Sequence, residues 1–114
     1  MKRSHNLSSL DWRLSGWTPW IWRLSGYMQT GAADQVDIAP IRAAVPGSVQ
    51  GALREAGLLP DWNCGLNARL CEWVENRHWV YEADIPDEWL AGGGVVRMNA
   101  LGLDDRGWVW LNGN

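Results

Sequence analysis

The second half of the chain contains three short segments in which apolar and polar residues alternate, at residues 79–85, 95–101 and 108–111. One face of the first segment carries Trp79, Tyr81, Ala83 and Ile85. Such alternation is typical of a strand with one buried face, because successive side chains point to opposite sides. Pro86 and the run Gly92–Gly94 supply turn signals between the segments. Short strands at this spacing predict a mainly β fold, an antiparallel β-sandwich.

The first half of the chain carries further strand signals. The motif Trp-Arg-Leu-Ser-Gly stands at residues 12–16 and again at 22–26, which fits two short strands or one long irregular strand. Small and polar residues at 29–36 predict a loop. Residues 36–45 then predict an edge strand, because Pro40 has no amide hydrogen to donate to a neighbouring strand.

One short helix is predicted near residues 48–56. Ser48 is a good N-cap, since its hydroxyl can accept a hydrogen bond from an amide of the first turn. Gly57 suits the left-handed position that ends a helix, and we expect Leu58 to close a hydrophobic contact there. One face of the helix collects apolar residues at three- and four-residue spacing, namely Val49, Ala52, Leu53 and Ala56.

At 114 residues the chain is long enough for one domain, which we place at residues 10–114 behind a flexible N-terminus of residues 1–9. The formal net charge is −3, which weighs against nucleic-acid binding because that would call for a basic surface. No apolar run is long enough to span a membrane, and no apolar segment follows the basic residues at the start. We therefore expect a cytoplasmic protein that binds neither nucleic acid nor membrane.

The connection at residues 59–78 is long, lacks a sustained period and is rich in Trp, Asn and carboxylate residues. Long connections of this kind are often functional. The chain has ten Trp residues and no Phe, and the flat apolar face of an indole matches the C–H face of a sugar ring. Most of the Trp residues are expected to fill the core. The candidate sugar-binding residues in the connection are Trp62, Asn63, Asn67, Glu72 and Trp73.

Some of the aromatic residues near this connection have a purely structural alternative. Trp79 begins an inward-facing alternation, so we expect it to pack beneath the connection. For Trp73, packing and a place in a sugar-stacking wall are equally consistent with the sequence. The exposure of Trp62 best tests the hypothesis of a stacking wall, in which Asn63 and Asn67 supply amide contacts to sugar hydroxyls.

The acidic and sulfur-containing residues of the connection are not expected to be catalytic or to bind metal. Glu72 and Glu75 are near each other in sequence, but arginine residues flank them, so solvated or Arg-paired carboxylates are expected. Cys64 and Cys71 lack the tight spacing of a zinc site, so two buried or free thiols are expected, with a disulfide across the connection as the alternative. We therefore expect no catalytic residue, no metal and no cofactor in this chain.

The last eight residues alternate in a strand pattern that runs into Asn112–Gly113, a strong signal for a two-residue hairpin turn. A hairpin needs a second strand, and the sequence ends at Asn114. We therefore interpret the chain as the front part of something longer, cut short at its C-terminus. An unpaired sheet edge in such a fragment is expected to favour self-association.

An ordered series of short motifs begins near residue 44. It comprises Ala44–Val49, Ala56–Asp61 at the end of the helix, Asn63, Asn67, Glu72–Tyr81, Leu101–Asp104 and Val109–Gly113. In this order the motifs resemble the N-terminal sugar-binding domain of glycoside hydrolase family 2, most of all its β-mannosidase and exo-β-glucosaminidase branch. Residues 12–26 are compatible with the opening strands of that family.

The resemblance implies a jelly-roll-like, galactose-binding-type β-sandwich at the front of a multidomain enzyme, with an immunoglobulin-like domain and a catalytic (β/α)8 barrel behind it. It also implies that both catalytic Glu residues lie on the barrel, outside this chain. The implied partners are carbohydrate and the remaining domains of the parent enzyme. The sequence departs from many β-mannosidases at three residues: Ala68 stands where they have Glu, and Cys64 and Gly65 stand near where they have aromatic residues.

The expected function is that of the N-terminal sugar-binding segment of a retaining, β-mannosidase-like exo-glycosidase that removes terminal β-linked sugars. The segment alone is not expected to hydrolyse glycosides. Two alternatives are a stand-alone carbohydrate- or protein-binding β-sandwich and a non-functional truncation product.

Overall fold

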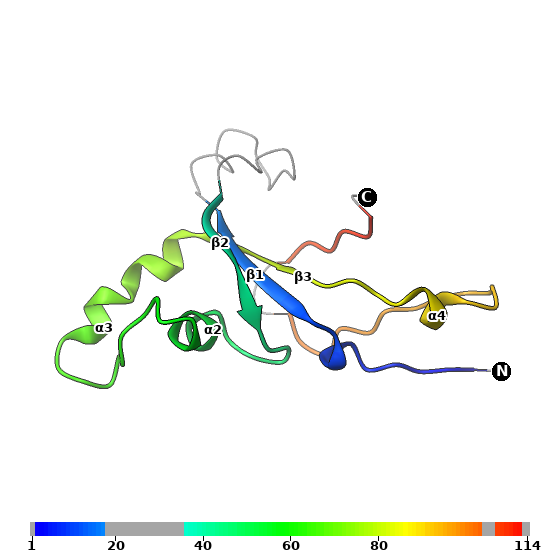
Figure 1. Ribbon diagram of the computed structural model, residues 1–114, viewed down its shortest axis with the longest axis horizontal. Coiled ribbons are helices and arrows are strands. Elements are labelled where there is room, and N and C mark those ends of the chain that lie inside the picture. Colours follow the sequence, from blue (N-terminus) through cyan, green and yellow to red (C-terminus); the bar gives the residue numbers. More distant parts are fainter. Residues whose placement is uncertain (1, 18–35, 104–106, 113–114) are drawn as a thin grey trace.

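A computed structural model describes residues 2–17, 36–103 and 107–112 of the protein (Figure 1). Its centre is an antiparallel sheet of three strands in the order β2-β1-β3. The strands are β1 Trp12–Trp17, β2 Val36–Ala43 and β3 His78–Glu82. The helical elements are η1 Leu7–Ser9, α2 Val49–Glu55, α3 Asn67–Leu70, η3 Glu72–Asn76 and α4 Asp87–Leu90. The predicted fold class, mainly β with a short helix near residues 48–56, is confirmed.

The central strand β1 pairs along both of its backbone edges. Its Leu14 lies opposite Ile41 of β2, and the Leu14 side chain is fully buried. The register shifts between this pair and the next pair, Gly16 and Ile38, so that Pro40 falls in a bulge. Proline donates no ladder hydrogen bond, and bulges and edge strands are therefore the places in a sheet that tolerate it. The predicted edge strand containing Pro40 is confirmed as β2.

Gly16 allows a close approach between β1 and β3. It lies opposite Trp79, and a Cβ atom on Gly16 would stand 2.8 Å from Cζ3 of the Trp79 ring and 3.1 Å from Cβ of Ile38. The indole N–H of Trp79 donates a 3.0 Å hydrogen bond to the carbonyl of Val74. The ring therefore packs over a strand position without a side chain and ties the sheet to η3, which is the packing role expected for Trp79.

The helix α2 has both of its predicted caps. At its start, the hydroxyl of Ser48 accepts a hydrogen bond from an amide of the first turn at 3.0 Å. At its end, the amide of Leu58 donates to Leu53 O at 2.8 Å and the amide of Gly57 donates to Arg54 O at 3.0 Å. Gly57 has a φ of 76°, which completes the Schellman arrangement and turns the chain back across the helix end.

The core lies where α2, the connection and the sheet meet. Its buried cluster consists of Leu53, Leu59 and Val74, and the partly buried residues packed against it are Ile38, Ile41, Val49, Cys71, Trp73 and Trp79. The prediction that Leu58 closes a hydrophobic contact at the helix end is wrong, since Leu58 is 46% exposed whereas Leu59 is only 6% exposed. The reversal of the chain at Gly57 turns Leu59, two residues later, toward Leu53.

The connection at residues 59–78 is more regular than the sequence predicts. It holds α3 and η3, and α3 has no side-chain cap, so its sequence carries no start signal. The turn signal at Pro86 is followed directly by the single helical turn α4. Within the described residues, no helix combines the length and the apolar character needed to cross a bilayer.

The predicted strands at residues 95–101 and 108–111 are wrong for the described structure, where neither segment is a strand. Val95 is 87% exposed and Leu101 is 102% exposed, so their apolar side chains pack on nothing. A strand needs a neighbour that shares its backbone hydrogen bonds, and the described sheet contains only β2, β1 and β3. Of the three segments that alternate, the first is confirmed, as β3.

The N-terminal segment lies against the turn of α4, at the end of the molecule away from α2 and α3 (Figure 1). The ring of His5 stacks on Trp89, with centroids 4.4 Å apart and planes 6° apart. Arg3 Nη2 donates a 3.4 Å hydrogen bond to Ala91 O. The domain boundary at residue 10 and the flexibility of residues 1–9 stay predictions. The second Trp-Arg-Leu-Ser-Gly motif and the loop predicted at 29–36 fall largely outside the described residues.

Candidate functional site

Asp61 organises the start of the connection, directly after α2. Its Oδ1 accepts a 3.0 Å hydrogen bond from the amide of Asn63, which is the local turn that aspartate side chains commonly make. Its backbone carbonyl accepts a 3.0 Å hydrogen bond from the side-chain amide of Asn67. Two of the candidate sugar-binding residues thus hold Asp61 in place.

Arg54, in the last turn of α2, contacts the same loop. Its Nη2 lies 3.3 Å from Oδ2 of Asp61, and the two side chains are 43% and 40% exposed respectively. The guanidinium carbon lies 5.1 Å from the centroid of the Trp62 ring, within the range of a cation–π contact. Asp61 and Trp62 are therefore joined through one arginine, and Trp62 itself is half-buried.

The charge on Asp61 is stabilised chiefly by its local hydrogen bonds. The amide of Asn63 lowers the pKa of Asp61 most, followed by the Cys64 thiol, whose Sγ lies 3.5 Å from Oδ2, and by Arg54. The same thiol donates to a carboxylate, so the hydrogen bond to Asp61 raises the pKa of Cys64. At neutral pH the loop therefore presents an ionised carboxylate beside a protonated thiol.

Glu72 and Trp73 lie on η3, apart from this cluster. Trp73 packs against the core, its ring centroid 6.2 Å from that of Trp79, and the guanidinium carbon of Arg77 lies 5.7 Å from the centroid of the Trp73 ring. Of the two roles open for Trp73, the structure shows packing. Glu72 is exposed, so its carboxylate faces solvent. A sugar contact by either residue stays a prediction.

The acidic and thiol side chains of the connection form no grouping of metal ligands within the described residues. Glu72 and Glu75 share the 3-10 segment η3, and both are exposed. Cys64 and Cys71 are free, as expected. Nowhere in residues 2–17, 36–103 and 107–112 do three or more His, Cys, Asp or Glu side chains gather as metal ligands would.

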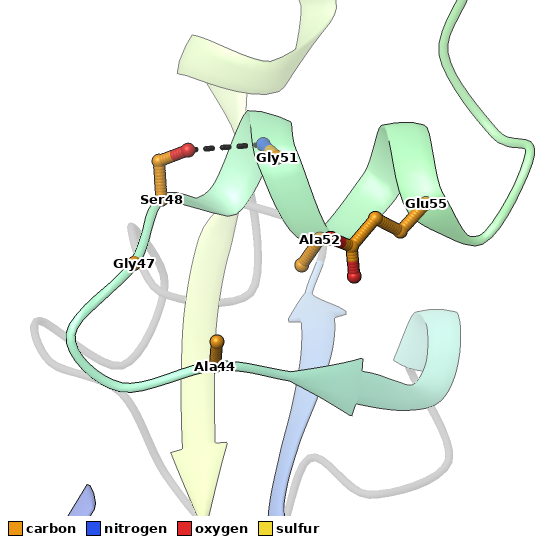
Figure 2. A pocket seen from close by; sticks show the side chains of 6 residues that line it. All are labelled: Ala44, Gly47, Ser48, Gly51, Ala52 and Glu55. Carbon is orange, nitrogen blue, oxygen red and sulfur yellow. Dashed lines mark hydrogen bonds between the residues drawn. The ribbon is translucent and has the colours of Figure 1, made fainter.

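A small hollow of about 120 Å³ lies beside the start of α2 (Figure 2). It is lined by Ala44, Gly47, Ser48, Gly51, Ala52 and Glu55. Figure 2 shows that the Ser48 hydroxyl is already used to cap the amide of Gly51, while Ala44 lies on the segment beneath the helix. The lining is mostly small and apolar, so this hollow offers few groups to a polar ligand, and the loop around Asp61 is the better candidate site.

Arg54 and Asp61 were not identified from the sequence as candidate site residues, although both belong to the group of side chains around Asp61. Arg54 belongs to the helix pattern, where a charged residue in the last turn needs no functional explanation. Seven positions separate it from Asp61, and only the reversal after Gly57 brings them together. An Asp two residues before an Asn, after a helix-ending Gly and Pro, is the one local signal that could have indicated a side-chain-stabilised turn.

Comparison with known proteins gives one match and two negative results. The family model described as the glycosyl hydrolase 2 galactose-binding domain-like family matches residues 22–114. No curated protein and no solved structure has a significant match to the chain. The matched region includes α2, the Asp61 loop, η3 and β3, and it covers well over half of the sequence. The chain therefore belongs to the galactose-binding-like domain family of glycosyl hydrolase 2.

Proposed function

We propose that this chain is the carbohydrate-contacting N-terminal module of a β-mannosidase-like glycosidase. The observation that carries the proposal is the family match over residues 22–114. The ordered motifs between Ala44 and Gly113 favour the β-mannosidase branch over other members. The loop after α2 carries an indole in contact with Arg54 and an ionised carboxylate, and these are groups suited to a sugar ring and its hydroxyls.

In this proposal the reacting carboxylates are not residues of this chain. A retaining glycosidase uses two carboxyl groups about 5–5.5 Å apart, one as acid and one as nucleophile. We assign both to a separate catalytic domain of the parent enzyme. The module helps to shape the pocket for the terminal β-linked sugar and braces that domain, in a jelly-roll-like sandwich.

Two measurements test the proposal. The purified chain should release no aryl group from an aryl β-mannoside, and measurable turnover would contradict the assignment of the carboxylates elsewhere. The NMR signals of the indole N–H groups of the chain should shift when methyl β-mannoside is added at millimolar concentration. Absence of any sugar-induced shift would contradict carbohydrate contact.

The reading frame of the gene distinguishes the proposal from a stand-alone binding module. A frame that continues for several hundred codons, with an Asn-Glu pair at a predicted barrel strand end, supports the glycosidase module. A frame that stops at the codon for Asn114 supports a free-standing β-sandwich instead.

A further inference from the structure

We infer that Arg54, Asp61 and Trp62 together form the sugar-contacting surface of this module, and that it takes a neutral sugar with two adjacent hydroxyl groups. The inference rests on the proposed function and deepens it. The sequence suggested the side-chain amides of Asn63 and Asn67 as the centre of the site. The inference places the centre instead at the ion pair of Arg54 and Asp61, whose arginine lies over the Trp62 ring.

The ion pair has unused hydrogen-bonding capacity that faces solvent. A carboxylate offers about four acceptor positions and a guanidinium offers five N–H donors. Within the described structure, Asp61 uses its oxygens for the Asn63 amide, the Cys64 thiol and Arg54, and Arg54 makes one ion-pair contact. The two side chains are 43% and 40% exposed, so donors and acceptors remain open to a ligand.

This pairing of donor and acceptor suits two neighbouring hydroxyls. One hydroxyl can donate to the Asp61 carboxylate while the next accepts from an Arg54 N–H, and both hydrogen bonds are charge-assisted. The distance of 3.3 Å between Nη2 and Oδ2 keeps the two groups side by side. A lone hydroxyl would satisfy only half of the arrangement.

Trp62 adds an apolar surface next to the ion pair. The Arg54 guanidinium lies over the ring, 5.1 Å from its centroid, and Trp62 is only half-buried, so we place the stacked sugar on the part of the ring that faces solvent. Stacking of the C–H face of a pyranose on an indole buries apolar area and fixes the sugar orientation. Arg54 then has two roles, since it holds the ring and donates to the ligand.

The charge balance of the cluster argues for a neutral sugar. Arg54 contributes one positive charge and Asp61 one negative charge, and the local hydrogen bonds keep Asp61 ionised at neutral pH. An anionic sugar would gain attraction from Arg54 but repulsion from Asp61, and a cationic sugar the reverse. Neither is favoured over an uncharged hydroxylated ring.

Asn63 and Asn67 become positioning residues in this site. Their hydrogen bonds go to Asp61 at 3.0 Å each, one to the carboxylate and one to the backbone carbonyl. The Asn67→Ala variant removes only the hold on the backbone. It should weaken sugar binding less than the loss of the carboxylate does.

The test uses the full chain and NMR titration with methyl β-mannoside, with the Trp62 indole signal assigned through the Trp62→Phe variant. Arg54→Gln and Asp61→Asn should each weaken binding by about tenfold or more, since each removes a charged hydrogen-bond partner. Arg13→Gln is the matched control, because Arg13 and Asp11 form an ion pair of the same 3.3 Å length on another part of the surface. Amide spectra that overlay with the wild type away from residues 54–67 confirm that each variant is folded.

The outcomes separate this inference from the proposed function. Tenfold weakening in the two loop variants, with unchanged binding by the control, supports the site. Wild-type affinity in both loop variants overturns the site but leaves the proposed function standing. A methyl β-glucuronide that binds tighter than methyl β-glucoside overturns the neutral class, and a wild-type chain that binds no sugar overturns both proposals.

Discussion

The sheet with α2 and the segment after α4 differ in what lies next to their apolar side chains. Leu14 and Leu53 are fully buried between strands and helix, whereas Leu101 and Val95 are surrounded by solvent. Both regions contain alternating or periodic apolar residues. Within the described residues, the first region alone has neighbouring elements, because β1 lies between β2 and β3 and α2 packs on β2.

The difference shows what an apolar pattern requires before it becomes structure. Burial of a Leu side chain contributes about 1.5–3 kcal/mol only when another surface covers it. The segments at residues 95–101 and 108–111 have the alternating residues of a half-buried strand, but no described element covers them. The following variants test the contrast, from the largest expected effect to the smallest.

The largest effect is expected at Leu53, at the centre of the buried cluster. Leu53→Ala should lower the free energy of unfolding by about 2–5 kcal/mol, from lost burial and the cavity left behind. Leu101→Ala, at a fully exposed position, should change it by less than about 0.5 kcal/mol. Urea unfolding followed by tryptophan fluorescence measures both. A large loss in the Leu101 variant would mean that residues 95–111 are covered in solution, and the contrast would fail.

The second effect concerns the contact of Gly16 with Trp79. Gly16→Ala places a Cβ 2.8 Å from the Trp79 ring, and the shift this forces should cost about 1–3 kcal/mol. Gly102→Ala is the control, since no atom lies within 4 Å of a Cβ at that position. Thermal unfolding of the two variants compares them. Equal melting temperatures would show that the indole does not pack on β1 as described.

The third effect is the loss of the helix cap. Ser48→Ala removes the acceptor for the Gly51 amide and should destabilise the protein by about 1 kcal/mol, while Ser48→Asp should retain most of the stability. Urea unfolding again provides the measurement. Gln50→Ala, in the same helix turn and exposed, serves as the control. If Ser48→Asp is as unstable as Ser48→Ala, capping is not the function of the hydroxyl.

The smallest effect is a dependence of stability on pH through His78 in β3. Burial lowers the pKa of His78 below 6.5, so the folded chain resists protonation that the unfolded chain accepts. The unfolded state therefore binds more protons as the pH falls below 6.5, and stability should decrease from there until the folded pKa is passed. His78→Asn should flatten the curve in this window. If the dependence of stability on pH is the same in His78→Asn as in the wild type, groups other than His78 cause it.

The start and the end of α2 could both be predicted from local chemistry. Ser48 and Gly57 act on amides and carbonyls a few residues away, so their effects are readable without any tertiary knowledge. The choice between Leu58 and Leu59 as the buried residue was not readable, because it depends on the direction in which the chain leaves the helix. Likewise, nothing in the sequence around Gly16 shows that Trp79, more than sixty positions later, will lie across it.

The candidate site was predictable only in part for the same reason. Trp62, Asn63 and Asn67 are neighbours along the chain, and they contact Arg54 or Asp61, but a sugar contact by any of them stays a prediction. Trp73 has the same composition signal but is drawn into the core by Trp79. Arg54 reaches the loop from a different element, and charge alone does not indicate which surface arginines lean on an indole.

Pro40 makes the two outer edges of the described sheet unequal. On the β2 side, an approaching strand meets a residue that offers no hydrogen and a backbone displaced from the regular spacing. The β3 side has no such interruption between His78 and Glu82. A further strand can therefore join the described sheet more readily at one edge than at the other, and we expect it alongside β3.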